Sequence, residues 1–214
     1  MTKQERLEKE IERTRLAHEF DMEFIEKYDI VCGIDEVGRG PLAGPVVTAA
    51  VILPKDCDIL YINDSKKLSE KKRKEVSLEI LEKAVAVGFG VADEKTIDKI
   101  NILNATKQAM REAVASLDPK PNMALVDAVT IEDLGIEQKA FVKGDAKSMS
   151  IAAASIVAKV KRDEFMEEMD ELYPEYGFKS NKGYGTKAHM DALREYGPCP
   201  IHRLSFLKFL NEDN

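Results

Sequence analysis

A short apolar segment, residues 30–37, constrains the fold most strongly, because it carries two adjacent acids, Asp35 and Glu36. Its length and its Val and Ile content predict a buried β-strand. Carboxylates are costly to bury unless a partner neutralises them. Because neighbouring strand residues point to opposite faces, both acids can serve one site only near a strand end or kink. The turn-forming sequence Gly38-Arg39-Gly40-Pro41 supplies that end.

Two further acids follow the same pattern. Asp127 ends the apolar run Ala-Leu-Val-Asp, and Asp145 stands just before a helical segment. Taken alone, Asp145 is better explained as a helix cap, whose oxygen accepts a backbone N–H. Taken together, four acids at the ends of three expected strands, without a matching set of His and Cys, favour Mg²⁺ or Mn²⁺ over zinc. We therefore expect a two-metal hydrolytic site made by Asp35, Glu36, Asp127 and Asp145.

Strand and helix patterns alternate along the rest of the chain. After the first strand, further strands are expected at 45–53, 84–92, 124–127 and 139–143. Helices are expected at 3–28, 69–83, 101–117, 148–172, 187–196 and 204–210, with a loop at 177–185. This order predicts an α/β fold with a mixed central sheet flanked by helices. We expect one domain over 30–214, including C-terminal helices, preceded by a helical extension over 1–29.

The charge balance restricts the possible partners. A net charge of −7 argues against a passive, nonspecific nucleic-acid binder. The charge is uneven, however: residues 64–75 hold six basic and three acidic residues, and residues 177–208 hold six basic and two acidic ones. These stretches would bind a polyanion together if the fold joins them, but solvated helix faces would have the same composition.

Membrane and secreted classes are not expected. No apolar run reaches the roughly 18 residues of a membrane helix, and the charged N-terminus lacks the apolar core of a signal peptide. The three cysteines are odd in number and far apart, which suits neither a disulfide framework nor a zinc site. We expect a cytoplasmic monomer that does not bind membranes.

Two glycine-flanked positions are candidates for substrate binding. The turn Gly38-Arg39-Gly40 lets backbone N–H groups approach a phosphate or sugar closely. Tyr184, between two glycines, would stack on a sugar or base if exposed. The alternative for Tyr184, packing of a loop onto the core, is equally consistent with the sequence.

Several polar residues elsewhere are also candidates. Ser65 and Lys66 offer a hydroxyl and an ammonium group for a phosphate, although they also stand just before a helix capped by Ser69. His202 and Arg203 would contact phosphate or orient a site group, but a lone His is more often structural.

In combination, these segments closely resemble the ribonuclease HII family. The resemblance rests on GIDEVGRGPLAGPV at 33–46, DSKKLS at 64–69, Asp127, KGDAKS at 143–148 with the Ala-rich 152–158 after it, KGYGT at 182–186 and HRLSF at 202–206. The blocks occur in the family's order and span about residues 30–207, nearly the whole chain.

The resemblance implies a ribonuclease H-like fold and specific roles. It puts divalent ions, Mg²⁺ or Mn²⁺, on the four acids named above. It implies that Gly38, Arg39 and Gly40 read the ribose 2′-hydroxyl at an RNA–DNA junction and that Tyr184 packs on the adjoining deoxyribose. The implied reaction is hydrolysis on the 5′ side of a ribonucleotide, in an RNA–DNA hybrid or in duplex DNA during ribonucleotide excision, leaving 3′-hydroxyl and 5′-phosphate ends.

Two other classes of protein are also consistent with parts of the sequence. One is another ribonuclease H-like nuclease or resolvase, in which Arg39 and Tyr184 would lack a specific partner. The other is a catalytically silent nucleic-acid-binding module, which would not need all four acids. The related ribonuclease HIII has a large N-terminal domain, for which the 29 residues before the first strand are too few.

Overall fold

A mixed five-stranded sheet in the order β3-β2-β1-β4-β5 forms the centre of the computed structural model, which describes residues 2–63 and 65–211. β1 pairs antiparallel with β2, which pairs antiparallel with β3, whereas β1, β4 and β5 run parallel. The strands are β1 (Val31–Val37), β2 (Val46–Ile52), β3 (Ala86–Ala92), β4 (Met123–Asp127) and β5 (Glu137–Phe141). The α/β class and the mixed sheet predicted from the sequence are confirmed.

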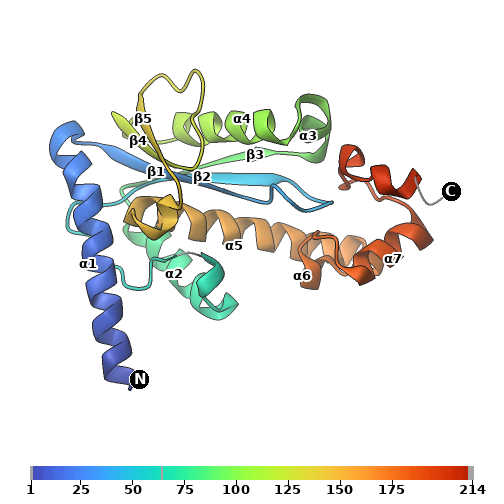
Figure 1. Ribbon diagram of the computed structural model, residues 1–214, viewed down its shortest axis with the longest axis horizontal. Coiled ribbons are helices and arrows are strands. Elements are labelled where there is room, and N and C mark those ends of the chain that lie inside the picture. Colours follow the sequence, from blue (N-terminus) through green and yellow to red (C-terminus); the bar gives the residue numbers. More distant parts are fainter. Residues whose placement is uncertain (1, 64, 212–214) are drawn as a thin grey trace.

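Helices cover both faces of the sheet (Figure 1), with α4 on one side and α5 on the other. The helices are α1 (Lys3–Tyr28), α2 (Glu70–Lys83), α3 (Glu94–Ile100), α4 (Ile102–Ala115), α5 (Met149–Leu172), α6 (Phe178–Asn181) and α7 (Lys187–Tyr196). Short 3-10 turns lie at Ser65–Lys67, Gly144–Ala146, Pro174–Tyr176, Leu204–Phe206 and Lys208–Asn211. None of the helices in the described ranges has the length and apolar character needed to cross a bilayer.

Glycine lets the helices approach the sheet closely. A Cβ on Gly33 of β1 would lie 2.1 Å from the carbonyl carbon of Ser150 in α5. A Cβ on Gly90 of β3 would lie 1.8 Å from the carbonyl oxygen of Ala109 in α4. The Ala-rich first half of α5 therefore packs almost backbone to backbone on β1, and side chains along this helix are fixed relative to the strand ends.

Local sequence signals explain where several helices begin. The hydroxyl of Ser69 accepts from the N–H of Lys72 at the start of α2, and the hydroxyl of Ser148 accepts from Ile151 at the start of α5. Asn101 separates α3 from α4 through a left-handed φ of 65° and caps α4.

Three segments differ from the expectation in the kind of structure that they form, and β5 begins and ends two residues earlier than expected. α3 was not expected, α6 lies inside the expected loop, and the segment 204–210 forms 3-10 turns instead of an α-helix.

The second half of the N-terminal helix α1 packs against β5 and α5. Phe20 and Phe24 make edge contacts with Phe141 of β5, and Asp21 accepts from the N–H of Ser150 at 2.7 Å. Its first half is charged and extends away from the sheet (Figure 1). The boundary at residue 29 stays a prediction.

The C-terminal segment forms a separate apolar cluster around Tyr176 and Phe178. Backbone hydrogen bonds attach it to the loop after β1: Leu42 N–H donates to Gly183 at 2.8 Å, and Gly44 N–H donates to Ile201 at 2.8 Å. This attachment places the segment around Tyr184 beside the turn that follows β1.

Candidate active site

A cleft of about 390 Å³ opens at the carboxyl ends of β1 and β4. Ile34 of β1 is in register with Val126 of β4, so the next residues, Asp35 and Asp127, reach the same edge of the sheet. This edge is where open α/β sheets commonly bind ligands. The cleft is lined by Asp35, Glu36, Val37, Ser65, Asp127, Asp145, Ser155, Lys159 and Tyr184. The structure thus places all four predicted acids, and two of the predicted substrate residues, on one cleft.

Backbone hydrogen bonds fix two of the carboxylates. One Asp35 oxygen accepts from the N–H of Glu36 at 2.7 Å, and one Asp127 oxygen accepts from the N–H of Gly144 at 2.7 Å. The second bond joins the end of β4 to the 3-10 turn that carries Asp145. The turn geometry therefore brings Asp145 to the cleft, and the hydroxyl of Ser148, not Asp145, caps α5.

Glu36 is only partly satisfied by its neighbours. Its Oε1 accepts from Arg39 Nη1 at 3.1 Å, whereas its Oε2 is buried without a hydrogen-bond partner in the part of the chain that the structure describes. A buried oxygen of this kind normally has a donor or a cation near it.

Burial and like charge both oppose ionisation in the cleft. Burial raises the pKa of Asp35 well above its ordinary value, and the charge of Glu36 adds to this effect. Burial also raises the pKa of Glu36, against the opposing effect of Arg39. Within residues 2–63 and 65–211, no three His, Cys, Asp or Glu side chains are close enough together to enclose a metal ion. The acids face one cleft without converging on one point.

Two buried arginines, Arg162 and Arg203, pack against the turn after β1 from the interior of the protein. Arg203 donates to the carbonyl oxygens of Gly38, Arg39, Pro41 and Gly44 at 2.6–3.0 Å. Gly38 has a φ of 95°, and a Cβ there would lie 2.2 Å from Nε of Arg162. The sequence left two roles open for Arg203, a phosphate contact or the orienting of a site group. Its side chain is fully buried and donates to the backbone of the turn, which agrees with the second role and not with the first.

Tyr184 stands beside this turn. Its Cε1 would be 3.7 Å from a Cβ on Gly40. Tyr184 is 46% exposed and lines the cleft, so it does not pack a loop onto the core. Its backbone is anchored, because its carbonyl oxygen is 2.9 Å from Nδ1 of His189.

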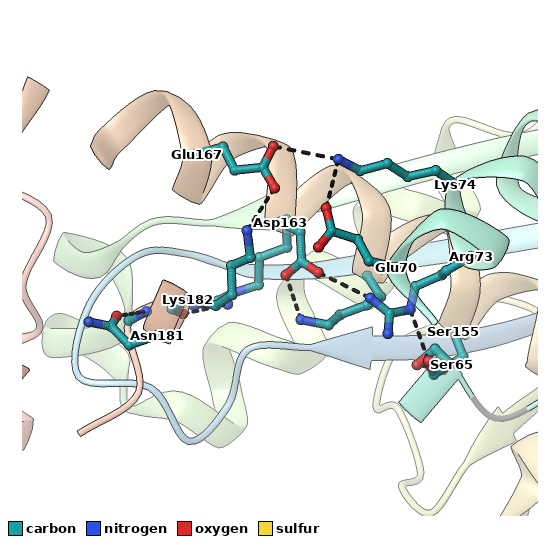
Figure 2. Close-up of polar contacts among 12 residues, drawn as sticks. Ser65, Glu70, Arg73, Lys74, Ser155, Asp163, Glu167, Asn181 and Lys182 are labelled. Atoms are coloured by element: carbon teal, nitrogen blue, oxygen red, sulfur yellow. Dashed lines mark hydrogen bonds and ion pairs between the residues drawn. The ribbon is translucent and has the colours of Figure 1, made fainter. Parts of the chain in front are cut away.

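A polar network forms the wall behind Ser65 (Figure 2). The hydroxyls of Ser65 and Ser155 are 3.1 Å apart, and Arg73 donates to the Ser65 carbonyl at 2.9 Å. Arg73 also reaches Asp163 of α5 at 3.4 Å. Farther along α5, Glu167 pairs with Lys74 and Lys182. The side chain of Lys66 lies outside the described part of the chain, as does Asp64 of the same motif.

Sequence reasoning missed two polar residues of the cleft, Ser155 and Lys159. A signal was present: with Asp163 they recur every four residues, at positions that share one face of a helix. The packing of α5 against β1 decides which face of the helix lines the cleft. The spacing of residues in the sequence does not show this packing.

Comparison with known proteins first defines the class. The structure of ribonuclease H2 from Pyrococcus horikoshii OT3 superposes with a TM-score of 0.72 and 27% identity, covering 86% of this chain and 98% of that one. The fold and the acidic cleft therefore define a nuclease of the ribonuclease H type.

The sequence comparisons then give the family. The family model of ribonuclease HII matches residues 32–209. A ribonuclease HII of Lachnoclostridium phytofermentans is 58% identical over 96% of this chain and 81% of its own length. One of Acetivibrio thermocellus is 55% identical over 94% and 79%, respectively. The chain belongs to the ribonuclease HII family, and it is a type 2 ribonuclease H that hydrolyses the RNA strand of RNA–DNA hybrids.

Proposed function

We propose that the chain cuts on the 5′ side of a ribonucleotide, both in RNA–DNA hybrids and at single ribonucleotides in duplex DNA, leaving 3′-hydroxyl and 5′-phosphate ends. The observation that carries this proposal is the meeting of four carboxylates and the exposed ring of Tyr184 in one cleft beside the 38–40 turn. The carboxylates supply the chemistry, and the turn and ring select the sugar.

Divalent-metal dependence is general among ribonucleases H, and the residues of the cleft fit such ions. Asp35, Glu36, Asp127 and Asp145 offer only hard oxygen donors, which suit Mg²⁺ or Mn²⁺. The buried Oε2 of Glu36, which lacks a partner among the described residues, and the raised pKa of Asp35 both favour a nearby cation. When bound, two such ions would activate a water molecule and stabilise the leaving oxygen.

The chain's own groups orient the substrate. Gly40 leaves room beside Tyr184 for a ribose to approach the turn backbone, whereas Gly38 makes room for Arg162 on the interior side of the turn. The backbone groups of the turn would hydrogen-bond the 2′-hydroxyl, the group that separates RNA from DNA. Tyr184 would pack on the next sugar. These contacts involve no base edge, so we expect cleavage without base preference.

One assay separates this function from its alternatives. The substrates are a DNA duplex with one embedded ribonucleotide and the same duplex without it, each incubated with Mg²⁺ or Mn²⁺. We expect one nick, 5′ of the ribonucleotide, and no cut in the all-DNA duplex. Equal cutting of both would support a nuclease without ribose selection, and binding without cutting would support a silent module.

The metal assignment is tested with Asp127→Asn. Asparagine keeps an oxygen that can accept from the Gly144 N–H, so the turn should survive. It removes the negative charge, so cleavage should fall by at least ~100-fold while duplex binding changes little. Near-normal turnover in this variant would exclude Asp127 from the metal site.

We also propose that the protein is a cytoplasmic monomer. The three cysteines are free, as in proteins of a reducing compartment. Light scattering of the purified protein tests the monomer: a mass near 24.0 kDa is expected, and twice that mass would contradict it.

A further inference from the structure

One face of α5 carries three polar residues, Ser155, Lys159 and Asp163, at intervals of four. Side chains four residues apart on a helix are neighbours, so the three form a row. Ser155 and Lys159 line the cleft, whereas Asp163 lies one turn farther along and is buried.

Asp163 is shared by two cations (Figure 2). One oxygen accepts from Nζ of Lys159 at 2.5 Å, and the other lies 3.4 Å from Nη1 of Arg73. Arg73 in turn donates to the carbonyls of Ser65 and Leu68. One buried carboxylate thus restrains a lysine of the cleft and, through Arg73, the turn that carries Ser65.

The charges of this group do not cancel. Lys159 and Arg73 carry two positive charges against the single negative charge of Asp163. Among the described residues that line the cleft, Lys159 is the only cation, beside four carboxylates. A nucleic-acid strand that enters the cleft brings negative phosphates to a negative surface. A positive side chain in the cleft would neutralise a phosphate of that strand.

We propose that Lys159 contacts a phosphate of the bound strand and that Asp163 is a positioning residue, which holds Lys159 against the cleft wall and fixes the Ser65 turn through Arg73. This inference rests on the proposed function, because it takes the carboxylate cleft as the active site. The competing explanation is that Lys159 only neutralises Asp163 within the wall.

The first test measures KM, kcat and the dependence of KM on KCl concentration, using the duplex with one ribonucleotide. Lys159→Met should raise KM about tenfold, and the slope of log KM against log salt should fall by about one phosphate contact, ~0.9. Lys159→Arg should retain most of the affinity. An unchanged KM and salt slope in Lys159→Met would overturn the proposal.

A matched control exists on the other side of the sheet. Lys107 of α4 is 15% exposed, against 17% for Lys159, and it also pairs with a carboxylate, that of Glu132. Lys107→Met should leave KM and the salt slope unchanged. A fall in the salt slope equal to that of Lys159→Met would show that total charge, not the position of Lys159, sets the affinity, and would overturn the proposal.

The double variant Lys159→Met with Asp163→Asn separates the two explanations. If the pair is only structural, removal of both charges should restore the wild-type KM. If Lys159 contacts phosphate, the double variant should bind as weakly as Lys159→Met. Asp163→Asn alone should raise KM about threefold because the lysine is less restrained, and Asp163→Glu should rescue it in part.

Failure of this inference and failure of the proposed function give different results. An inactive Asp127→Asn beside a normal Lys159→Met would overturn the lysine assignment and keep the metal site. A fully active Asp127→Asn would remove the metal assignment, and a raised KM in Lys159→Met would then still place a phosphate contact in the cleft.

Discussion

Replacing Arg203 should disturb the turn after β1 without touching any residue of the cleft. The guanidinium is fully buried and donates five hydrogen bonds to four carbonyl oxygens, those of Gly38, Arg39, Pro41 and Gly44. Two of these carbonyls belong to the turn that we propose reads the ribose. Arg203 therefore holds the shape of the recognition turn from the interior.

The size of the effect follows from those bonds. A hydrogen bond to a charged group contributes roughly 1.5–3 kcal/mol, so four acceptors give about 6–12 kcal/mol before compensation. The desolvation of the guanidinium offsets much of this sum, and water would reach some of the exposed carbonyls. We expect Arg203→Met to lower the free energy of unfolding by about 3–5 kcal/mol, a large part of the ~5–15 kcal/mol typical of a domain.

A milder substitution separates stability from function. Arg203→Lys keeps the charge but lacks the planar fork of donors, so it can serve only some of the carbonyls. We expect a loss of about 2 kcal/mol, an intact fold and a displaced turn. The kcat/KM for cleavage at a single embedded ribonucleotide should then fall at least ~10-fold, because even a small misplacement of a bound substrate slows the reaction strongly.

Urea unfolding followed by circular dichroism gives the stability, and nicking of the one-ribonucleotide duplex gives the efficiency. The control is Arg194→Lys, because Arg194 is exposed and pairs with Asp191 at the surface. It should change stability by less than about 0.5 kcal/mol. If Arg203→Lys loses stability but cleaves as efficiently as the wild type, the turn does not depend on this guanidinium.

Two further perturbations test separate parts of the molecule. Burial raises the pKa of Asp21, so the folded state binds its proton more tightly than the unfolded chain does, and the free energy of unfolding should fall as pH rises from about 3.8 through the higher folded pKa. Asp21→Asn should flatten this slope in urea titrations between pH 3 and 7, and an unchanged slope would contradict the assignment. Tyr184→Ala should lower kcat/KM at a junction by about 5- to 100-fold through lost stacking, whereas Tyr184→Phe should keep most of it; unchanged kinetics in Tyr184→Ala would make the ring dispensable.

The fold could be predicted where an apolar segment is long and turn-forming or capping residues mark its ends. β1, β2 and α5 are long apolar or Ala-rich segments bounded by Gly, Pro or a capping Ser, and their positions are confirmed within one or two residues. α3 was missed because it is a seven-residue helix separated from α4 only by the left-handed backbone of Asn101. The hydrophobic pattern of the sequence does not indicate such a break between two helices.

The site was predictable to the extent that it lies at strand ends. Asp35 and Asp127 stand next to apolar strands in the sequence, so their position at one sheet edge follows from parallel pairing alone. Lys159 and Ser155 come from the middle of a helix, and only the packing of α5 on Gly33 decides that their face meets the cleft. Their place in the cleft therefore depends on tertiary structure.

Buried positive charge lies close to the turn after β1 in this acidic chain. Arg162 and Arg203 form no ion pair among the described residues, and both are satisfied by backbone carbonyls instead. Burial lowers the pKa of Arg203 to about 9 and that of Arg162 to about 10, so both remain cations at neutral pH. Neither guanidinium is paired directly with a carboxylate, although the charge of Asp163 acts on Arg162 and the charges of Asp98 and Glu94 act on Arg203. The net charge of −7 therefore says little about the potential at the cleft, where four carboxylates and the cation Lys159 are held on separate elements.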